Sequence, residues 1–425
     1  MIKNHKISLL KFALIALLIE WPMIVSYVWM TGDFSVPRFN VWPISDWLIN
    51  YHAGFVRRGL AGELLLRLFG DGSLIKPLYI LVFCSFVAYV VCFMWVYLKS
   101  KVRNSNLLLA ALLIQGGIFH MGISSDFYTR KENLFLVFLA ILCLLYLQIQ
   151  AAKEDSRSFW IGLFVSFLLL IAPLLVLIHE AYFFMSFPVT LLLLWILGKE
   201  NPSNRYCRMA MYIFPLEIVS LFLICSYFHG DIDSGQRIWD TLPFADRLFL
   251  SPGAPYSSFG ALSSLGWGLD QQLTTLYGVF SSGGILIWLF FLLGNTLVLI
   301  YMASSITSTK SVNQPTQYVR WVLVSVFISS GMFLIGCDWG RWLAYLSNQT
   351  VLVMFTLSQS KFVFTKETSK RFLMVNSIFK CMSGPGVLGF VLIYGLAFQM
   401  PECCATDTAI FTPYEAYYRL IRHFF

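Results

Sequence analysis

The sequence predicts an all-α, polytopic transmembrane helix bundle with about eleven membrane spans. Of its 425 residues, 58% are hydrophobic and only 12% are charged, and this charged share is roughly half that of a typical soluble domain. Apolar runs long enough to cross a bilayer recur along the whole chain. The composition therefore predicts a single transmembrane domain over residues 1–425 and leaves no segment for a soluble domain.

The expected spans are joined mostly by short polar turns. Lys3, Lys6 and Lys11 flank the start of the first span, as in a signal peptide, but no small-residue cleavage site follows, so we expect this span to be retained. The spans are expected at residues 9–29, 77–98, 106–123, 133–150, 159–178, 181–198, 209–228, 284–304, 320–336, 342–359 and 384–400.

The basic residues indicate an orientation. If the N-terminus is cytoplasmic, the inner turns hold most of the Lys and Arg, as the positive-inside rule requires. The net charge of +8 is then explained by topology and does not indicate nucleic-acid binding. The outer turns carry mainly Arg, whose planar fork suits phosphate and carboxylate. We expect a multi-pass protein of the bacterial inner membrane, with its C-terminus in the periplasm.

Two outer loops are long. The first, residues 30–76, contains SDWLINYHAGFVRRGLAGELLLRLFGDGS, and its second half has the pattern of an amphipathic interfacial helix. The second, residues 229–283, is rich in Gly, Ser, Asp and aromatic residues. The tail, residues 401–425, is expected to form another interfacial helix on the outer side. In the first loop the apolar side of the helix is formed by Leu60, Leu64, Leu65 and Leu68, with Arg57, Arg58 and Arg67 largely off it.

The first outer loop also carries the first of four polar clusters. It contains Asp46, His52, Arg57, Arg58 and Glu63. One interpretation is an interfacial helix whose arginines bind lipid headgroups. The other is a clamp for a diphosphate or an anionic sugar beside a carboxylate, since guanidinium groups bind such anions in a bidentate manner.

The second cluster lies in the turn between the third and fourth expected spans. Asp126, Arg130, Lys131 and Glu132 place four charges in seven residues. Internal ion pairing explains them equally well as a functional arrangement. In the functional arrangement Arg130 and Lys131 face a phosphate, and one of the two acids carries out acid–base chemistry.

The other two clusters also fall at outer span ends. His179 and Glu180 sit between two very apolar spans, where ionisable residues are costly and need partners. Asp338 and Arg341 are three residues apart, so they share a helix face if a helix begins there. Trp339 beside them suits either the membrane interface or the face of a sugar. A polar turn and a helix-end salt bridge are the structural alternatives.

The shared location of the four clusters is the main functional signal. The inner turns contain plain Lys and Arg with Ser, Asn and Thr, whereas the outer turns mix Asp, Glu, His and Arg. The sequence contains no phosphate-binding loop, no G-x-S-x-G and no metal-ligand spacing. No motif indicates a particular cofactor or metal ligand. A divalent cation held by Asp231 and Asp233 together with a diphosphate remains an alternative.

This plan resembles integral-membrane glycosyltransferases of the GT-C class and bacterial O-antigen or capsule polysaccharide polymerases. The resemblance rests on the many spans, on two long outer loops and on outer clusters of Arg with acids. The acidic pair that GT-C enzymes often carry in the first outer loop is absent here, where Asp46 stands alone and Glu63 follows later. The resemblance therefore covers the chain by topology and does not decide between transferase and polymerase.

The resemblance implies an enzyme that acts on polyprenyl-(di)phosphate-linked sugars, such as undecaprenyl phosphate derivatives, in lipopolysaccharide or capsule synthesis. Its partners would be this substrate, the bilayer and other polysaccharide-assembly proteins. The expected base is one of Asp46, His179, Glu180 and Asp338. The expected contacts to phosphate or sugar are His52, Arg57, Arg58, Asp126, Arg130, Lys131, Glu132, Trp339 and Arg341. A transporter or flippase for a lipid-linked or anionic substrate is the main alternative, and a non-catalytic assembly or immunity protein is a third.

Overall fold

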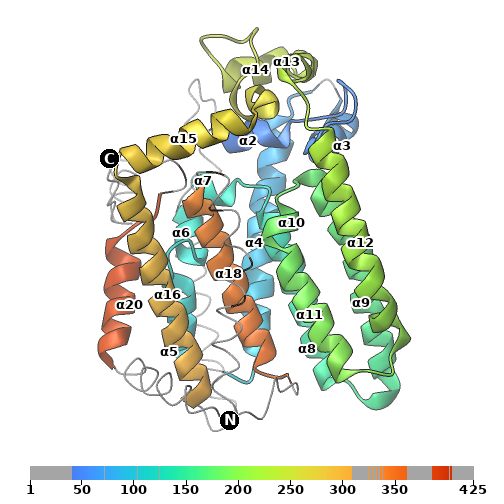
Figure 1. Cartoon of the computed structure of the whole chain (residues 1–425), viewed down its shortest axis with the longest axis vertical. Helices are drawn as coiled ribbons and strands as arrows, with labels where there is room; N and C mark the ends of the chain where they lie inside the picture. Colours follow the sequence, from blue (N-terminus) through green and yellow to red (C-terminus); the bar gives the residue numbers. More distant parts are fainter. Residues whose placement is uncertain are drawn as a thin grey trace.

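A computed structural model of the chain describes residues 41–308 apart from 71, 103 and 124, residues 338–360 and 385–401, and the single positions 324, 328, 333, 336 and 403. Every regular element within these residues is a helix (Figure 1). The expected first span at 9–29, most of the ninth at 320–336 and nearly all of the tail at 401–425 lie outside the described residues.

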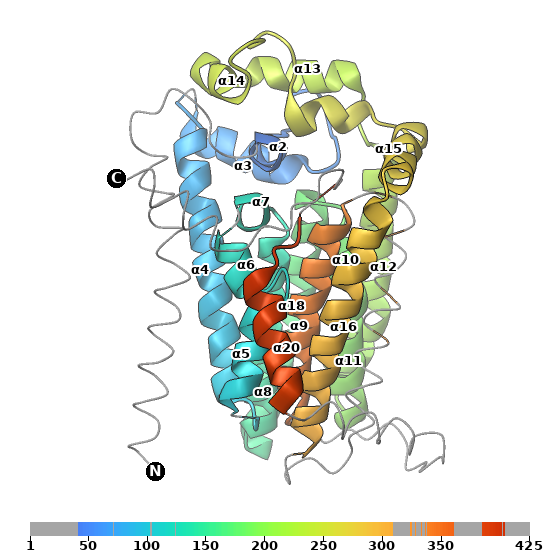
Figure 2. The ribbon, with the colours of Figure 1, turned by 90° about the vertical axis from the view of Figure 1, so that its left-hand side faces the viewer.

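The protein is a helical membrane protein. Five described helices are long and apolar enough to cross a bilayer, and they run along the long axis of the bundle (Figures 1 and 2). The expected count of about eleven spans is not confirmed. The helix α20 (Pro385–Ala397) is also apolar, but it is shorter than these five. The five are α4 (Ile75–Lys99), α8 (Asn133–Ala151), α9 (Glu154–Ile178), α12 (Arg205–Tyr227) and α16 (Gly284–Ser308).

Two expected spans are broken. The segment 106–123 forms α5 (Ser105–Leu113) and the short α6 (Ile118–Ile123), and the segment 181–198 forms α10 (Tyr182–Met185) and α11 (Phe187–Glu200). Gly116, in the first break, has a φ of 71°, a conformation that side chains disfavour. A Cβ there would also overlap Ala344 of the neighbouring α18 (Trp339–Leu357).

We therefore expect Gly116→Ala to lower the free energy of unfolding by about 2–4 kcal/mol, the sum of overpacking and left-handed backbone strain. Gly162→Ala is the matched control, because Gly162 lies inside α9 and a Cβ there would meet nothing within 4 Å. That change should stabilise the protein by about 0.4–1 kcal/mol. Thermal unfolding in detergent measures both, and equal melting temperatures for the two variants would contradict the role of the break.

The helix α18 is central to the bundle. All of its side chains but Arg341 are buried, including the polar run at positions 347–350. The Asn348 amide donates to the Gly116 carbonyl at 2.7 Å, and the Asn295 amide donates to the Gln115 carbonyl at 2.9 Å. These amides satisfy carbonyls that the broken helix leaves without partners. A helix enclosed by protein can therefore carry polar residues that a lipid-facing span excludes.

One end of the bundle is covered by a layer that we call the cap. The two long loops of the sequence meet in it, because the Ala261 amide donates to Ser45 Oγ at 2.9 Å and the Asn50 amide donates to Thr241 Oγ1 at 3.1 Å. Figures 1 and 2 show the cap at one end of the long axis. It consists of α2 (Val41–Trp47), α3 (Gly59–Phe69), α13 (Ile232–Thr241), α14 (Phe244–Leu250), the 3-10 helix η1 (Gly260–Gly266) and α15 (Leu269–Ser281).

The expected amphipathic helix of the first loop is α3, and part of its apolar side is exposed on the surface. Leu65 is buried together with Ala61 and Gly62, whereas Leu64 and Leu68 are exposed. Gly62 allows this packing because its Cα lies against the backbone at Leu48 and Ile49. The helix begins at Gly59, so Arg57 and Arg58 precede it and are not part of its polar face.

Candidate functional site

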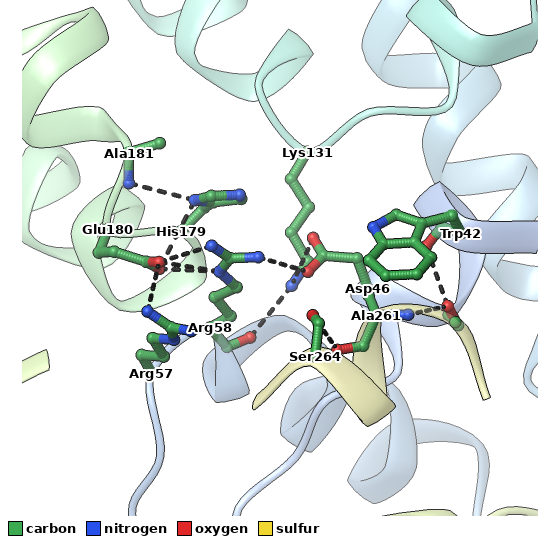
Figure 3. Close-up of polar contacts among 12 residues, drawn as sticks. Trp42, Asp46, Arg57, Arg58, Lys131, His179, Glu180, Ala181, Ala261 and Ser264 are labelled. Atoms are coloured by element: carbon green, nitrogen blue, oxygen red, sulfur yellow. Dashed lines mark hydrogen bonds and ion pairs between the residues drawn. The ribbon is translucent and has the colours of Figure 1, made fainter. Parts of the chain in front are cut away.

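Nine residues from the four polar clusters converge beneath the cap, and we call them the charge cluster. They come from α2, the turn before α3, the turn before α8, the turn after α9 and the start of α18. Figure 3 shows the part around Arg58, where side chains from α2 and three turns point toward one another. The nine are Asp46, Arg57, Arg58, Lys131, Glu132, His179, Glu180, Asp338 and Arg341.

Arg58 lies at the centre of the charge cluster. Its Nε and Nη2 donate to Glu180 Oε1 at 2.9 and 2.7 Å, and Nε also reaches Oε2 at 3.0 Å (Figure 3). Its φ of 66° is the one positive φ among described residues other than glycine. This backbone conformation costs about 1 kcal/mol. The carbonyl of Arg58 accepts a hydrogen bond from Lys131 Nζ at 3.1 Å, which holds the conformation in place.

Asp46 is held by two cations from different turns. Its carboxylate lies 3.3 Å from Lys131 Nζ and 3.5 Å from Arg58 Nη1. Burial alone would raise the pKa of Asp46, but the charges of Lys131 and Arg58 outweigh burial and hold this pKa well below its ordinary value. The Lys131 side chain is fully buried. Asp46 is therefore an ionised structural partner and a weak base.

Within the charge cluster, Glu132 links Arg341 to His179. Its Oε1 lies 3.3 Å from Arg341 Nε and 3.9 Å from His179 Nε2. Arg341 Nη2 also donates to Asp338 Oδ2 at 2.6 Å, so the expected pair at the start of α18 forms and is joined to the cluster. With 30% of its side chain exposed, Asp338 is the most accessible carboxylate of the charge cluster.

His179 has a defined tautomer. The Ala181 amide donates to His179 Nδ1 at 3.1 Å, so the proton of the neutral ring is on Nε2, which faces Glu132. Burial, followed by the charge of Arg58, lowers the pKa of His179 to about 4, although Glu180 and Glu132 oppose this. At neutral pH His179 is an uncharged hydrogen-bonding group beside two carboxylates.

Arg57 differs from Arg58 in having few partners. Its Nη1 lies 3.7 Å from Glu180 Oε1, and its buried Nε has no hydrogen-bond acceptor among the described residues. The backbone amide of Arg57 donates to the Phe228 carbonyl at 2.9 Å, which fixes the residue against the end of α12. Arg57 therefore retains hydrogen-bonding capacity for a further anion.

The nine residues of the charge cluster are balanced in charge, and Arg130 adds one positive charge among the described side chains. Arg130 is buried beside it, and burial, followed by the charge of Arg341, lowers the pKa of Arg130 to about 10. Counting Arg130, five cations face four carboxylates, and the neutral His179 adds no charge. One net positive charge in a buried setting favours the binding of an anion.

Residues 12–246, more than half of the chain, match the family described as uncharacterised membrane protein Rv1490. The chain belongs to this family. No curated protein and no solved structure matches it. The region shared with the Rv1490 family contains the first seven residues of the charge cluster in chain order, and only Asp338 and Arg341 lie beyond it.

Two of the predicted site residues lie apart from the charge cluster in this Rv1490-family chain. His52 is exposed, and Glu63 of the same loop is paired with Arg67 at 2.6 Å. Trp339 is buried among aromatic rings, and its Nε1 donates to the Gly336 carbonyl at 2.7 Å. In α18 the side chain of Trp339 packs into the bundle. The side chain of Asp126 lies outside the described residues.

Asp231, one of the two residues predicted to hold a divalent cation, has a structural role. Asp231 is the N-cap of α13, and its carboxylate accepts hydrogen bonds from the amide and the hydroxyl of Ser234. In the part of the chain that the structure describes, no three His, Cys, Asp or Glu side chains group so that they could hold a metal. Whether a divalent cation takes part stays a prediction.

Trp47 was missed by the sequence reasoning. Its Nε1 donates to the Thr129 carbonyl at 2.7 Å and ties α2 to the turn that carries Lys131 and Glu132. The only sequence signal is its position directly after Asp46 in an outer loop. That signal is weak because Trp is common at membrane interfaces.

The pKa of His179 predicts a distinct acid transition. Because the folded pKa of about 4 lies below the ordinary 6.5, the unfolded chain binds the proton first, and stability falls as the pH drops from 6.5 toward 4. The carboxylates Asp46 and Glu180 have lowered pKa values and act in the same direction only at more acidic pH. The melting temperature of wild type should fall as the pH is lowered from 7 to 4. In His179→Gln this fall should be shallower. An unchanged slope in the variant would contradict the prediction.

Proposed function

We propose that the protein is a membrane glycosyltransferase that uses a polyprenyl-(di)phosphate-linked sugar or oligosaccharide and builds or modifies a cell-surface polysaccharide such as O-antigen or capsule. The observation that carries the proposal is the charge cluster itself. It combines several half-buried guanidinium groups with carboxylates beneath a cap at one end of a membrane bundle, and the buried Nε of Arg57 has no hydrogen-bond partner among the described residues.

The contacts divide the chemistry among the residues. Departure of a polyprenyl diphosphate develops negative charge, which guanidinium groups in a water-poor site stabilise. Arg57 is the best placed for this because its buried Nε has no hydrogen-bond partner among the described residues and its Nη1 lies 3.7 Å from Glu180. An acceptor hydroxyl needs a base, and Asp338, which accepts a hydrogen bond from Arg341, is the carboxylate of the charge cluster most open to solvent.

The proposed location is the bacterial inner membrane, with the cap on the periplasmic face. At the opposite end of the bundle the helix termini and turns carry seven basic residues against the three acids Glu154, Asp155 and Glu200, and no histidine among the described residues. The positive-inside rule assigns such an end to the cytoplasm. These basic residues are Lys99, Lys101, Lys153, Arg157, Lys199, Arg205 and Arg208.

A lipid-substrate flippase or transporter is a second candidate, and the broken helices favour it. Transporters typically place interrupted helices and polar residues in the middle of the bundle. The break at Gln115–Gly117 faces the amides of Asn295 and Asn348 in the bundle interior. The charged groups, however, gather at the end beneath the cap, where a transferase needs them.

Reconstitution separates the two candidates. Purified protein is placed in vesicles with a radiolabelled polyprenyl-linked sugar and an acceptor oligosaccharide. A transferase moves the label from the lipid to the acceptor, whereas a flippase changes the leaflet of the intact lipid-linked sugar. Transfer of label in wild type is the expected result. Leaflet exchange without transfer would replace the proposal with the flippase, and neither activity across a panel of lipid-linked sugars would overturn both.

A further inference from the structure

A pocket of about 520 Å³ lies at the end of the bundle opposite the cap. It sits between the first turns of α9 and α12 and the turn that joins α11 to α12. It is far from the charge cluster, because α9 begins at this pocket and ends next to His179. The lining includes Arg157, Ser158, Asn201, Ser203, Asn204 and Arg205.

The pocket presents donors that suit a phosphate. The Nε of Arg157 is buried and has no hydrogen-bond partner among the described residues. Arg205 is exposed, and its guanidinium stacks on the Tyr206 ring at 5.2 Å, which holds it at the rim. Both α9 and α12 begin here, and the N-terminal ends of helices carry partial positive charge that adds to the two arginines.

The acidic residues of the lining do not cancel these donors. Glu200 Oε2 accepts hydrogen bonds from the Tyr146 hydroxyl at 2.8 Å and from the Gln150 amide, and its Oε1 accepts from the Ser360 hydroxyl at 2.7 Å. Its carboxylate is therefore occupied within the bundle. Glu154 is exposed in the first turn of α9, so the lining carries two carboxylates and two guanidinium groups, and Arg157 keeps a buried Nε without a hydrogen-bond partner among the described residues.

Exposed apolar residues follow the pocket-lining residues along both helices. Directly beyond the pocket, α9 exposes Phe159, and α12 exposes Met209 and Tyr212. Exposed apolar side chains on membrane-spanning helices face acyl chains, and basic pockets between helix ends bind phospholipid headgroups. We propose that this pocket binds one membrane phospholipid, with its phosphate between Arg157 and Arg205 and its acyl chains along α9 and α12. This site is independent of the function proposed for the charge cluster.

Native mass spectrometry of the full-length protein in detergent tests the site. Wild type, Arg157→Ala, Arg157→Lys and Arg208→Ala are compared for retention of added phosphatidylglycerol or phosphatidylethanolamine. Arg208 is the matched control, because it is an exposed arginine in the first turn of α12 outside the pocket lining. We expect retention of one phospholipid to fall at least tenfold in Arg157→Ala, to fall less in Arg157→Lys and to stay unchanged in Arg208→Ala.

Three outcomes would overturn the proposal. Equal retention in wild type and Arg157→Ala would show that the pocket does not hold the lipid. Equal loss in Arg157→Ala and Arg208→Ala would show only diffuse attraction to a basic surface. Displacement of the lipid by millimolar inorganic phosphate, with the same phosphate raising the melting temperature, would assign the pocket to a free anion. Melting temperatures of all variants confirm that they are folded.

Discussion

Replacing Arg58 with Ala is expected to lower the free energy of unfolding by about 3–5 kcal/mol, because it leaves buried carboxylates without their main partner. Glu180 would lose three hydrogen bonds, and Asp46 would lose one of its two cations. Among the described residues, the nearest cation left to Glu180 would be Arg57, at 3.7 Å. Unfolding in mixed micelles, followed by tryptophan fluorescence, measures the change.

Two further variants make this result specific. Arg67→Ala is the matched control, because Arg67 is exposed and pairs with Glu63 within one helix turn, an arrangement that contributes less than about 1 kcal/mol. Arg58→Gly removes the same side chain but suits the positive φ, so it should be about 1 kcal/mol more stable than Arg58→Ala. If Arg58→Ala were as stable as Arg67→Ala, Arg58 would not organise the charge cluster.

Replacing Arg57 with Ala is expected to leave the fold largely intact and to reduce sugar transfer by about 10²–10³-fold, the loss typical of a missing charge-stabilising donor. The fold persists because Glu180 retains its three hydrogen bonds from Arg58. In the proposed reaction, transfer falls because Arg57 Nε, which has no hydrogen-bond partner among the described residues, would donate to the leaving diphosphate. In cells, the same variant should give shorter surface polysaccharide or less of it.

Arg57→Lys refines this test. Lysine keeps the charge but lacks the planar fork, so partial activity indicates a charge effect, and activity as low as in Arg57→Ala indicates a need for bidentate geometry. Initial rates in vesicles and melting temperatures are measured together for each variant. Wild-type transfer in a folded Arg57→Ala protein would remove Arg57 from the site and leave Arg341 as the next candidate.

The convergence of the four polar turns was predictable from topology alone. Charges at alternate turns of a bundle fall on one side of the membrane, and side chains such as His179 and Glu132 need partners there because burial is costly. The pairing of Asp338 with Arg341 followed from helical spacing and is present at 2.6 Å. The pairing across segments, such as Arg58 with Glu180, could not be read from spacing, since it depends on how the helices pack.

The distinct roles of Arg57 and Arg58 were also beyond the sequence. The two are adjacent and chemically identical, and only the backbone separates them: a φ of 66° directs Arg58 to Glu180, while Arg57 is fixed against the end of α12. The break at Gly116 was missed for a similar reason. A run of apolar residues with one Gln fits a span by composition. Its interruption depends on Asn295 and Asn348, which follow much later in the chain.

The central position of α18 has a consequence for biogenesis. This helix is enclosed by helices that are synthesised long before it, and it supplies Arg341 to Glu132 and Asn348 to Tyr89. A growing chain inserts its helices in order. The polar groups of the earlier helices that α18 contacts therefore lack these partners until the chain has been made as far as residue 357. The earlier helices therefore need protection at the insertion machinery until α18 is added. A chain truncated before α18 should be degraded by membrane quality-control proteases.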